Sequence, residues 1–274
     1  MDTVKERLEA ILAEATANVW PSPRMLAFYN WVGRLPLKLG TLMMLLASPD
    51  SAQVIYLAGV KGRTDAALQV LYHYHFRWWR LWWGLGDALF LNAANARSVR
   101  SRGRFVRMAA SYLLRGLATA NGHNILRLVS LGSGSASQLL QGAADNGFGE
   151  TRVRVVLVDR DGRALKAGVA NAMRMGVAGA VTICKKTIGE YLRESDKAWA
   201  HVIEMVGLAD YFDDERLQEY LSGIYQALIP GGCLMCANIS SKREFAYAHG
   251  AACWPAMFYR TREELVGMLV KAGF

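Results

Sequence analysis

From about residue 125 onward, short apolar runs alternate with amphipathic segments. The apolar runs have the length and the branched side chains of buried strands, and they predict strands at 126–131, 153–158, 181–184, 201–206 and 233–239. Between them, apolar positions recur with the helical period and predict helices at 136–145, 164–175, 215–228 and 261–272. This alternation is typical of a parallel sheet covered by helices, and right-handed crossovers make such a sheet doubly wound. The pattern therefore predicts an α/β fold for this part of the chain.

The first part of the chain has a helical pattern instead. Apolar positions recur with helical spacing after Thr3 and Glu6, which have the spacing of a capping box. The segment 68–91 is very aromatic. We therefore expect a helical N-terminal cap at residues 1–95, followed by an α/β domain at residues 96–274.

The composition narrows the class of protein. The chain has 274 residues, of which 53% are hydrophobic and 20% are charged, and this excludes a disordered chain. Its 4 cysteines are too few for a disulfide framework, and no apolar run approaches the ~20 residues needed to cross a bilayer. The N-terminus lacks the apolar core of a signal peptide, so we expect a cytoplasmic protein.

The net charge is +9 and lies mostly in the N-terminal part. Residues 1–120 carry 15 Lys and Arg against 7 Asp and Glu, whereas residues 121–274 carry 17 against 16. A basic field attracts anionic partners, which include nucleic acid, acidic lipid and a carboxylate or phosphate substrate. The net charge alone does not identify which of these partners the protein binds.

A glycine-containing loop follows the first predicted strand and opens a helix. Gly132 and Gly134 lack the Cβ that would keep a ligand away from the backbone, and the helix N-terminus offers free amides. About 25 residues further on, Asp159 stands just beyond the second predicted strand. A carboxylate at that place can accept hydrogen bonds from both hydroxyls of a ribose. The alternative is a tight turn that binds no ligand.

Three other functional motifs fit this loop less well. A nicotinamide dinucleotide fingerprint requires Gly or Ala where Ser137 stands. A P-loop requires a Gly-Lys-Ser/Thr sequence, which does not follow here. The nucleophile elbow of hydrolases requires a serine between two glycines, whereas Ser130 has Leu128 and Gly132 at those places.

Four sequence blocks resemble, in the same order, those of class I methyltransferases that use S-adenosylmethionine. The blocks are residues 129–134, 156–161, 201–212 and 228–234, and the resemblance covers about residues 95–274. It implies a Rossmann-like, mostly parallel sheet and S-adenosylmethionine as the cofactor. The residues that it assigns to the cofactor are Ser130, Gly132, Ser133, Gly134, Asp159, Arg160, Ile188, Val206 and Gly207. It places Asp210 and Tyr211 in the loop that faces the methyl group, which makes them the candidate catalytic residues.

A narrower resemblance involves residues 207–212 and Tyr259-Arg260-Thr261. These two sequence segments are similar to those of bacterial methyltransferases that are sometimes joined to hydrolase modules. They are also similar to those of methyltransferases that esterify hydroxy fatty acids into signalling methyl esters. The resemblance implies a bacterial-type enzyme with an O-linked acceptor, and it does not identify the substrate.

The sequence departs from the family pattern in three places. Ser130 stands where the family often has an acid near the cofactor's ammonium group. The segment 185–190 lacks the acid that often binds the adenine amine, so backbone amides or Glu190 would have to serve. The sequence stops at residue 274, where the family usually continues into a strand hairpin. We therefore expect either a fragment or a fold without that hairpin, with an exposed sheet edge.

Several residues have both a structural and a functional interpretation. Asp210 can cap a turn or face the acceptor, and Tyr211 can pack against the sheet instead. Glu204 lies in an otherwise apolar strand, and an unpaired buried carboxylate is costly. We therefore expect it to have a partner such as an arginine or backbone donors. Asp161 is expected to cap a helix.

Three further clusters have alternative interpretations. Four arginines share one helical face that either makes ion pairs or binds an anionic substrate: Arg97, Arg100, Arg104 and Arg107. An aromatic, basic cluster either packs inside the protein, lines an acceptor pocket or contacts a membrane surface: His73, His75, Phe76, Arg77, Trp78, Trp79, Arg80, Trp82 and Trp83. Cys233 and Cys236 lie in a predicted buried strand without a second pair, so we expect no metal site.

The favoured function is S-adenosylmethionine-dependent methyl transfer to a small-molecule or lipid-like acceptor. This reaction is an in-line displacement, in which the protein mainly holds the acceptor and excludes water. A carboxylate acceptor needs no base, so the sequence reveals few residues specific for the acceptor. Two alternatives stay open: an RNA methyltransferase that uses the basic N-terminal half, and a non-catalytic scaffold that binds a membrane or a partner.

Overall fold

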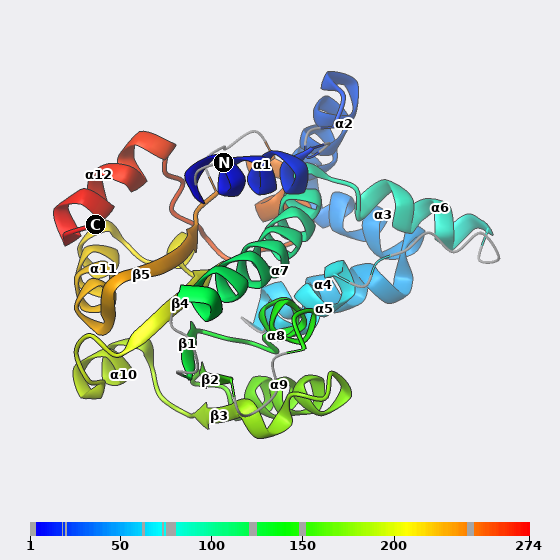
Figure 1. The fold of residues 1–274 in the computed structure, drawn as a ribbon. Helices are drawn as coiled ribbons and strands as arrows, with labels where there is room; N and C mark the ends of the chain where they lie inside the picture. Colours follow the sequence, from blue (N-terminus) through cyan, green and yellow to red (C-terminus); the bar gives the residue numbers. More distant parts are fainter. Residues whose placement is uncertain are drawn as a thin grey trace. The chain divides into compact units, whose positions relative to one another are not determined.

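The computed structural model describes residues 4–17, 19, 21–61, 64–72, 74, 81–120, 125–147, 152–239 and 244–274. The chain forms two compact units (Figure 1). The sheet unit comprises Met1–Ile11, Arg104–Ser240 and Phe258–Phe274, and the helical unit comprises Leu12–Gly103 and Ser241–Met257. Some residues singled out in the sequence lie outside the described residues, namely Thr3, His73, His75, Phe76, Arg77, Trp78, Trp79 and Arg80.

The sheet unit contains a five-stranded parallel sheet. Its strands are β1 (Leu126–Leu131), β2 (Val153–Val158), β3 (Val181–Cys184), β4 (Ala200–Val206) and β5 (Leu228–Ala237). They are ordered β3-β2-β1-β4-β5, and every neighbouring pair is parallel. The order reverses between β1 and β4, and such sheets bind ligands in the crevice outside the carboxyl ends of the strands at this point. The structure therefore confirms the predicted α/β class.

The start of β5 differs most from the prediction. β5 begins at Leu228, whereas the sequence pattern predicts a strand that starts at residue 233 after a turn. The pairing of β5 with β4 shifts its register between Leu228 and Cys233. The segment Pro230-Gly231-Gly232 is thus an irregularity within the strand, which agrees with the tendency of proline and glycine to occur at strand irregularities.

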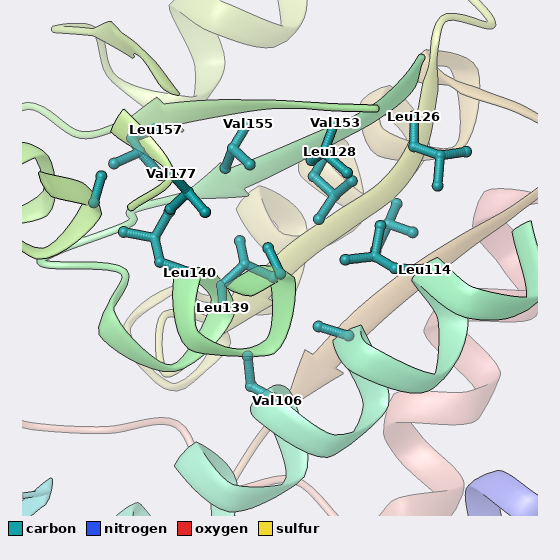
Figure 2. Packing of buried hydrophobic residues seen from close by; sticks show 14 of the residues in the cluster. Val106, Leu114, Leu126, Leu128, Leu139, Leu140, Val153, Val155, Leu157 and Val177 are labelled. Atoms are coloured by element: carbon teal, nitrogen blue, oxygen red, sulfur yellow. The ribbon is translucent and has the colours of Figure 1, made fainter. Parts of the chain in front are cut away.

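Helices cover both faces of the sheet. α8 (Ser137–Ala144), α9 (Gly162–Arg174) and the second half of α7 (Ala94–Ala120) share a core with residues such as Leu128 of β1 (Figure 2). A second core, which includes Val129, contains residues of α10 (Ile188–Glu194) and α11 (Asp214–Ala227), with α12 (Arg262–Ala272) packed against it. Leu128 and Val129 are adjacent in β1, so successive side chains point to opposite faces. Both faces are buried, as the predicted doubly wound, Rossmann-like fold requires.

Side chains cap the starts of α9 and α12. Asp161 caps α9 by accepting a hydrogen bond from the backbone N–H of Arg163 at 2.9 Å, which confirms its predicted role. Thr261 and Glu264 form the predicted capping box at the start of α12. Gly176, just beyond α9, has a φ of 71°, a left-handed conformation that glycine adopts at little cost.

The helical unit consists of helices together with the segment that follows β5. Its helices are α2 (Pro23–Arg34), η1 (Pro36–Lys38), α3 (Leu39–Ala47), α4 (Pro49–Lys61), α5 (Thr64–Tyr72) and α6 (Leu81–Phe90), with the end of α1 (Val4–Thr16) and the start of α7. The segment after β5 contributes the π-helical turn η5 (Tyr247–Ala251), which packs against α2. Glycine at 33 permits this close approach, because a Cβ there would lie 2.1 Å from the carbonyl oxygen of Ala246. None of the described helices is both long enough and apolar enough to cross a membrane.

The segment after β5 also caps the N-terminus of α7. The carboxylate of Glu244 accepts hydrogen bonds from the backbone N–H groups of Ala94 at 2.7 Å and Asn95 at 2.8 Å. Burial raises the pKa of this carboxyl group, and the two N–H groups act in the opposite direction. A residue 150 positions away from Ala94 thus satisfies donors that a helix N-terminus leaves without intrahelical partners.

Replacing Leu140 by alanine should destabilise the sheet unit. Leu140 lies in α8, is fully buried and belongs to the same core as Leu128. The lost contacts and the resulting cavity should lower the free energy of unfolding by about 2–5 kcal/mol, as measured by chemical denaturation. Val270→Ala, at an exposed position of α12, is the control and should change this free energy by less than about 0.5 kcal/mol. Equal effects of the two substitutions would contradict this description of the core.

Candidate functional site

The glycine loop, residues 132–136, connects β1 to α8 at the carboxyl edge of the sheet. Gly132 and Gly134 have φ values of 61° and 51°, a left-handed backbone that favours glycine. Gly132 is also in close contact with the loop after β4, because a Cβ there would lie 1.8 Å from Cδ1 of Leu208. The backbone conformation therefore favours glycine at both 132 and 134, and a side chain at 132 would also displace the side chain of Leu208.

The carboxylate of Asp159 joins the end of β2 to the glycine loop. Its Oδ2 accepts a hydrogen bond from the N–H of Gly134 at 2.9 Å, and its Oδ1 accepts one from the N–H of Asp161 at 2.8 Å. The N–H of Ser133 donates to the carbonyl oxygen of Val158 at 2.9 Å. Two parts of the predicted site that are 25 residues apart in sequence are thus in direct contact.

Ser130 and Glu204 form a buried polar pair between β1 and β4. They are partners in the parallel register, and the Ser130 hydroxyl donates a hydrogen bond of 2.5 Å to Oε2 of Glu204. Oε1 of Glu204 accepts one from the backbone N–H of Val206 at 2.7 Å. Glu204 is only 8% exposed, and the expectation that this carboxylate has backbone donors is confirmed. The Ser130 hydroxyl is a partner that the sequence did not reveal.

The N-terminus of α8 carries a buried hydroxyl group. Ser137 is the first residue of α8 and is 7% exposed. Within the described part of the chain, its Oγ has no hydrogen-bond partner. An unpaired buried hydroxyl is costly, and together with the free amides of a helix N-terminus it suits an anionic group of a ligand. This feature fits the carboxylate at the amino-acid end of S-adenosylmethionine.

Asp210 and Tyr211 belong to the short helical turn η4 (Ala209–Tyr211) after β4. Asp210 is 1% exposed, and its carboxylate accepts a hydrogen bond of 2.6 Å from the backbone N–H of Ile239. Its carbonyl oxygen accepts one from the N–H of Phe258 at 2.7 Å. Both bonds tie the loop after β4 to the chain that follows β5, whereas Tyr211 is half-buried. The geometry of Asp210 is therefore that of a positioning residue.

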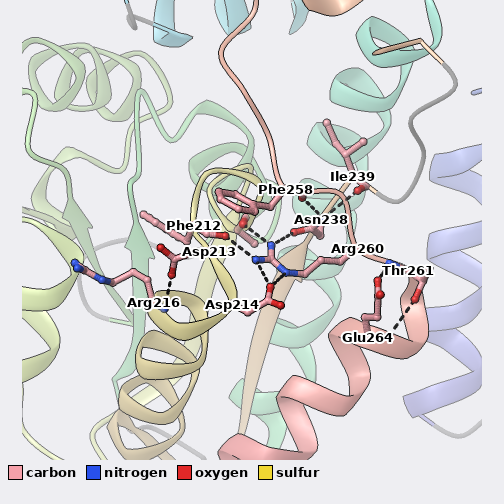
Figure 3. Close-up of polar contacts among 11 residues, drawn as sticks. Phe212, Asp213, Asp214, Arg216, Asn238, Ile239, Phe258, Arg260, Thr261 and Glu264 are labelled. Atoms are coloured by element: carbon pink, nitrogen blue, oxygen red, sulfur yellow. Dashed lines mark hydrogen bonds and ion pairs between the residues drawn. The ribbon is translucent and has the colours of Figure 1, made fainter.

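Arg260 is a buried cation that the sequence indicated only as part of the narrower resemblance. It is 4% exposed, and its guanidinium group donates to the carboxylate of Asp214 at 2.7 Å and to the amide oxygen of Asn238 at 3.0 Å (Figure 3). It also donates to the carbonyl oxygens of Ala209 at 3.0 Å and Phe212 at 2.6 Å. One side chain thus connects the loop after β4, the start of α11 and the residue that follows β5.

The remaining predicted cofactor residues differ in their surroundings. Gly207 follows β4 with a φ of 90°, and Val206 at the end of β4 is half-buried. Arg160, next to Asp159, is exposed. Ile188 begins α10, and its side chain is buried in the core. Its backbone is therefore the part that a ligand could reach.

Glu190, the alternative ligand for adenine, takes part in a capping box at the start of α10. Its carboxylate accepts hydrogen bonds from the N–H and from the hydroxyl of Thr187, both at 2.8 Å. These hydrogen bonds lower the pKa of the Glu190 carboxyl group. Because this carboxylate holds the start of the helix, backbone amides are the better candidates for the adenine side.

Two arginines of the predicted basic face on α7 have structural partners. Arg107 forms an ion pair with Asp145 at 2.6 Å, which raises the pKa of the arginine and lowers that of the aspartate. Arg100 donates to the carbonyl oxygen of Leu91 at 2.7 Å and to the side chain of Asn92 at 2.9 Å. These contacts favour the structural interpretation for both residues.

Cys233 and Cys236 both lie in β5. Burial raises the pKa of both thiols, and that of Cys236 rises to about 12. Both thiols are therefore protonated at neutral pH, whereas the thiolate is the form that attacks electrophiles and binds metals.

A separate groove of about 730 Å³ lies between α11 and α12. Its lining includes Gln218 of α11, Lys271 of α12 and Tyr259. Neither Asp159 nor any residue of the glycine loop lines this groove. It is therefore distinct from the glycine loop and Asp159 at the carboxyl ends of β1 and β2.

No protein-family model matches the chain, and no curated protein matches it. A solved structure from Bordetella parapertussis, described as a possible exported protein, matches 100% of this chain and 93% of its own, with 17% identity and a TM-score of 0.55. The pyocyanin biosynthetic protein PhzM is similar over 86% of this chain and 67% of its own, with 17% identity and a TM-score of 0.48. An S-adenosylmethionine-dependent methyltransferase of Archaeoglobus fulgidus is similar over 61% and 69%, with 18% identity and a TM-score of 0.42. The likeness to the Bordetella structure shows a shared fold.

Replacing Arg260 by glutamine should loosen the loop after β4. The substitution removes the donor to the carbonyl oxygens of Ala209 and Phe212 and lowers the free energy of unfolding by about 2 kcal/mol. Backbone amides of residues 209–214 should then exchange hydrogen roughly tenfold faster, as measured by mass spectrometry. Arg216→Gln, which removes an exposed cation 3.8 Å from Glu219, is the matched control and should leave this exchange unchanged. Equal exchange in the two variants would refute the positioning role of Arg260.

Proposed function

We propose that the chain is an S-adenosylmethionine-dependent methyltransferase that acts on a small-molecule or lipid-like acceptor. The observation that carries this proposal is the hydrogen bond between Gly134 and Asp159, beside the point where the order of the parallel strands reverses. Nucleoside cofactors bind to such sheets at this point, with backbone amides of the first loop and a carboxylate after the second strand as ligands. The glycine loop and Asp159 supply both groups.

The residues present suit the different parts of the cofactor. Asp159 would accept hydrogen bonds from the ribose hydroxyls, since a carboxylate offers about four acceptor positions and two backbone N–H groups use only part of them. The N-terminus of α8, with the hydroxyl of Ser137, would bind the carboxylate of the amino-acid end. Val206 and Gly207 would lie against the same ligand at the end of β4. When bound, the cofactor supplies a methyl group on a positively charged sulfur.

The chain's own residues would position the acceptor and exclude water. Asp210 and Arg260 hold the loop after β4 in one conformation, and Leu208 of that loop packs on Gly132. We propose that a bound acceptor and this apolar side chain together exclude water from the reacting groups. We propose that Tyr211, which is half-buried next to Asp210, contacts the acceptor. An acceptor carboxylate carries no proton to remove, so the proposal requires no general base.

The variant Asp159→Asn should bind S-adenosylhomocysteine at least about tenfold more weakly than the wild type, because the amide offers fewer acceptor positions to the ribose. Isothermal titration calorimetry measures this change, and a thermal melt checks that the variant is folded. The matched control is Asp161→Asn, which alters the cap of α9 and should change the affinity by less than about twofold. Unchanged binding to a folded Asp159→Asn variant would remove the ribose assignment.

Methyl transfer from labelled S-adenosylmethionine should be detectable with hydroxy fatty acids or aromatic acids and absent with RNA. The ion pair of Arg107 and the hydrogen bonds of Arg100 reduce the basic face that could contact phosphates. Scintillation counting of the extracted products separates the two acceptor classes. Label in RNA, together with RNA binding that weakens steeply as salt rises, would favour the RNA alternative instead.

A further inference from the structure

The helix α3 exposes its large apolar side chains. Five such side chains in this helix and the turn before it are exposed, and we call them the α3 surface: Leu37, Leu39, Leu42, Met43 and Leu46. The last four are spaced at i, i+3, i+4 and i+7, so they share one face of the helix. A surface helix of a globular protein ordinarily turns its apolar stripe toward the core. An exposed apolar surface of this kind is typical of a binding surface.

The opposite face of α3 packs inside the helical unit and fixes the orientation of the helix. Its buried residues are Gly40, Thr41 and Met44. The backbone at Gly40 lies so close to α2 that a Cβ there would be 2.0 Å from the carbonyl oxygen of Val32. The hydroxyl of Thr41 donates to the carbonyl oxygen of Ala251 at 2.9 Å. These contacts hold the small and polar side inward, so the α3 surface stays outside.

The turn before α3 places a leucine almost fully in solvent. Leu37 is 93% exposed, and Leu37 and Lys38 have φ values of 52° and 61°. A left-handed conformation strains residues other than glycine. A side chain with this exposure gains little from apolar contacts within the protein, so these contacts do not offset the strain. Burial of Leu37 in a binding partner would offset it.

The charges that lead up to the α3 surface are all positive. Residues 21–47 contain Arg24, Arg34 and Lys38 and no aspartate or glutamate, and the next acid, Asp50, lies in the first turn of α4. All three cations are exposed. Cations beside an exposed apolar surface are complementary to an anionic lipid membrane, whose charged headgroups lie directly above its hydrocarbon. Trp31, which is also exposed, has a side chain suited to the same interface.

We propose that the α3 surface binds the protein to an anionic lipid membrane. Leu37 and Leu46 would enter the hydrocarbon, and Arg34 and Lys38 would lie at the level of the headgroups. A second copy of this chain is the competing occupant, but a two-fold symmetric pair would bring the same positive charges together, which opposes association. The inference goes beyond the proposed function, because no residue assigned to the cofactor belongs to the α3 surface. Either can therefore fail without the other.

Flotation of the 274-residue chain with vesicles tests this assignment. The vesicles contain phosphatidylcholine with or without phosphatidylglycerol, and the wild type should bind the anionic ones at least about tenfold more tightly. The double variant Leu37→Ser, Leu46→Ser keeps every charge. It should bind the anionic vesicles at least about tenfold more weakly than the wild type, because two side chains no longer enter the hydrocarbon. The double variant Arg34→Gln, Lys38→Gln should also bind more weakly, with a smaller dependence on salt.

The matched control removes two exposed apolar side chains from the sheet unit. Met173→Ser, Val270→Ser changes side chains that are 66% and 64% exposed and leaves every charge in place. This double variant should bind the anionic vesicles within about twofold of the wild type. Thermal melts check that all variants are folded, as expected for substitutions at exposed positions.

Each other outcome overturns the inference. If the Leu37→Ser, Leu46→Ser variant floats as the wild type does, the net positive charge alone attracts the vesicles. If the control loses binding to the same extent, the α3 surface is not the site of contact. Equal flotation with neutral and anionic vesicles would contradict the role of Arg34 and Lys38. If the wild type does not float, and sedimentation shows a dimer that the leucine variant converts to a monomer, the occupant is a second copy.

Discussion

The hydrogen bond between the N–H of Gly134 and the carboxylate of Asp159 holds the ends of β1 and β2 together, and the candidate site depends on it. The left-handed conformation of Gly132 and Gly134 brings the chain back across the end of the sheet within a few residues. The same loop then leads into the N-terminus of α8 at the carboxyl end of β1. A substitution that disturbed this contact would therefore displace backbone amides and a carboxylate at the same time.

A second constraint acts on the loop after β4. The chain passes from the sheet unit to the helical unit after residue 240 and re-enters the sheet unit at Phe258. At the point of re-entry, the N–H of Phe258 donates to Asp210, and Arg260 donates to two carbonyl oxygens of the same loop. The conformation of the loop after β4 thus depends on the segment with which the chain re-enters the sheet unit. This explains why Asp210 and Arg260 are almost fully buried although both are charged.

Local sequence signals predicted most of the sheet unit. The strands at 126–131 and 153–158, the cap at Asp161 and the capping box at Thr261 depend on neighbouring residues, and the structure confirms them. The early start of β5 was not predicted, because an irregular strand pairing has no simple periodicity. The helix α10 was not predicted either, because its seven residues make only about two turns, too few for a clear helical pattern. The residues predicted to bind the cofactor around Gly132 and Asp159 do come together, since parallel strands end at one edge of the sheet.

The contacts that the sequence did not reveal join residues far apart in the chain. Ser130 and Glu204 are 74 residues apart, and Glu244 caps a helix that begins 150 residues earlier. The sequence indicated that Glu204 needs a partner, but only the order of the strands identifies Ser130 as that partner. The partners of Glu244 likewise follow only from the fold of the chain after β5. The pairing of Ser130 with Glu204 follows from the position of β4 beside β1 in the sheet.

Hydrogen exchange of the whole chain with and without S-adenosylhomocysteine tests the central claim most directly. The account predicts that the ligand slows exchange at the amides of residues 132–138, at the end of β2 and at residues 204–208. Exchange in the groove between α11 and α12 should stay unchanged. Protection confined to that groove, or no protection at saturating ligand, would contradict a cofactor site at the carboxyl ends of β1, β2 and β4.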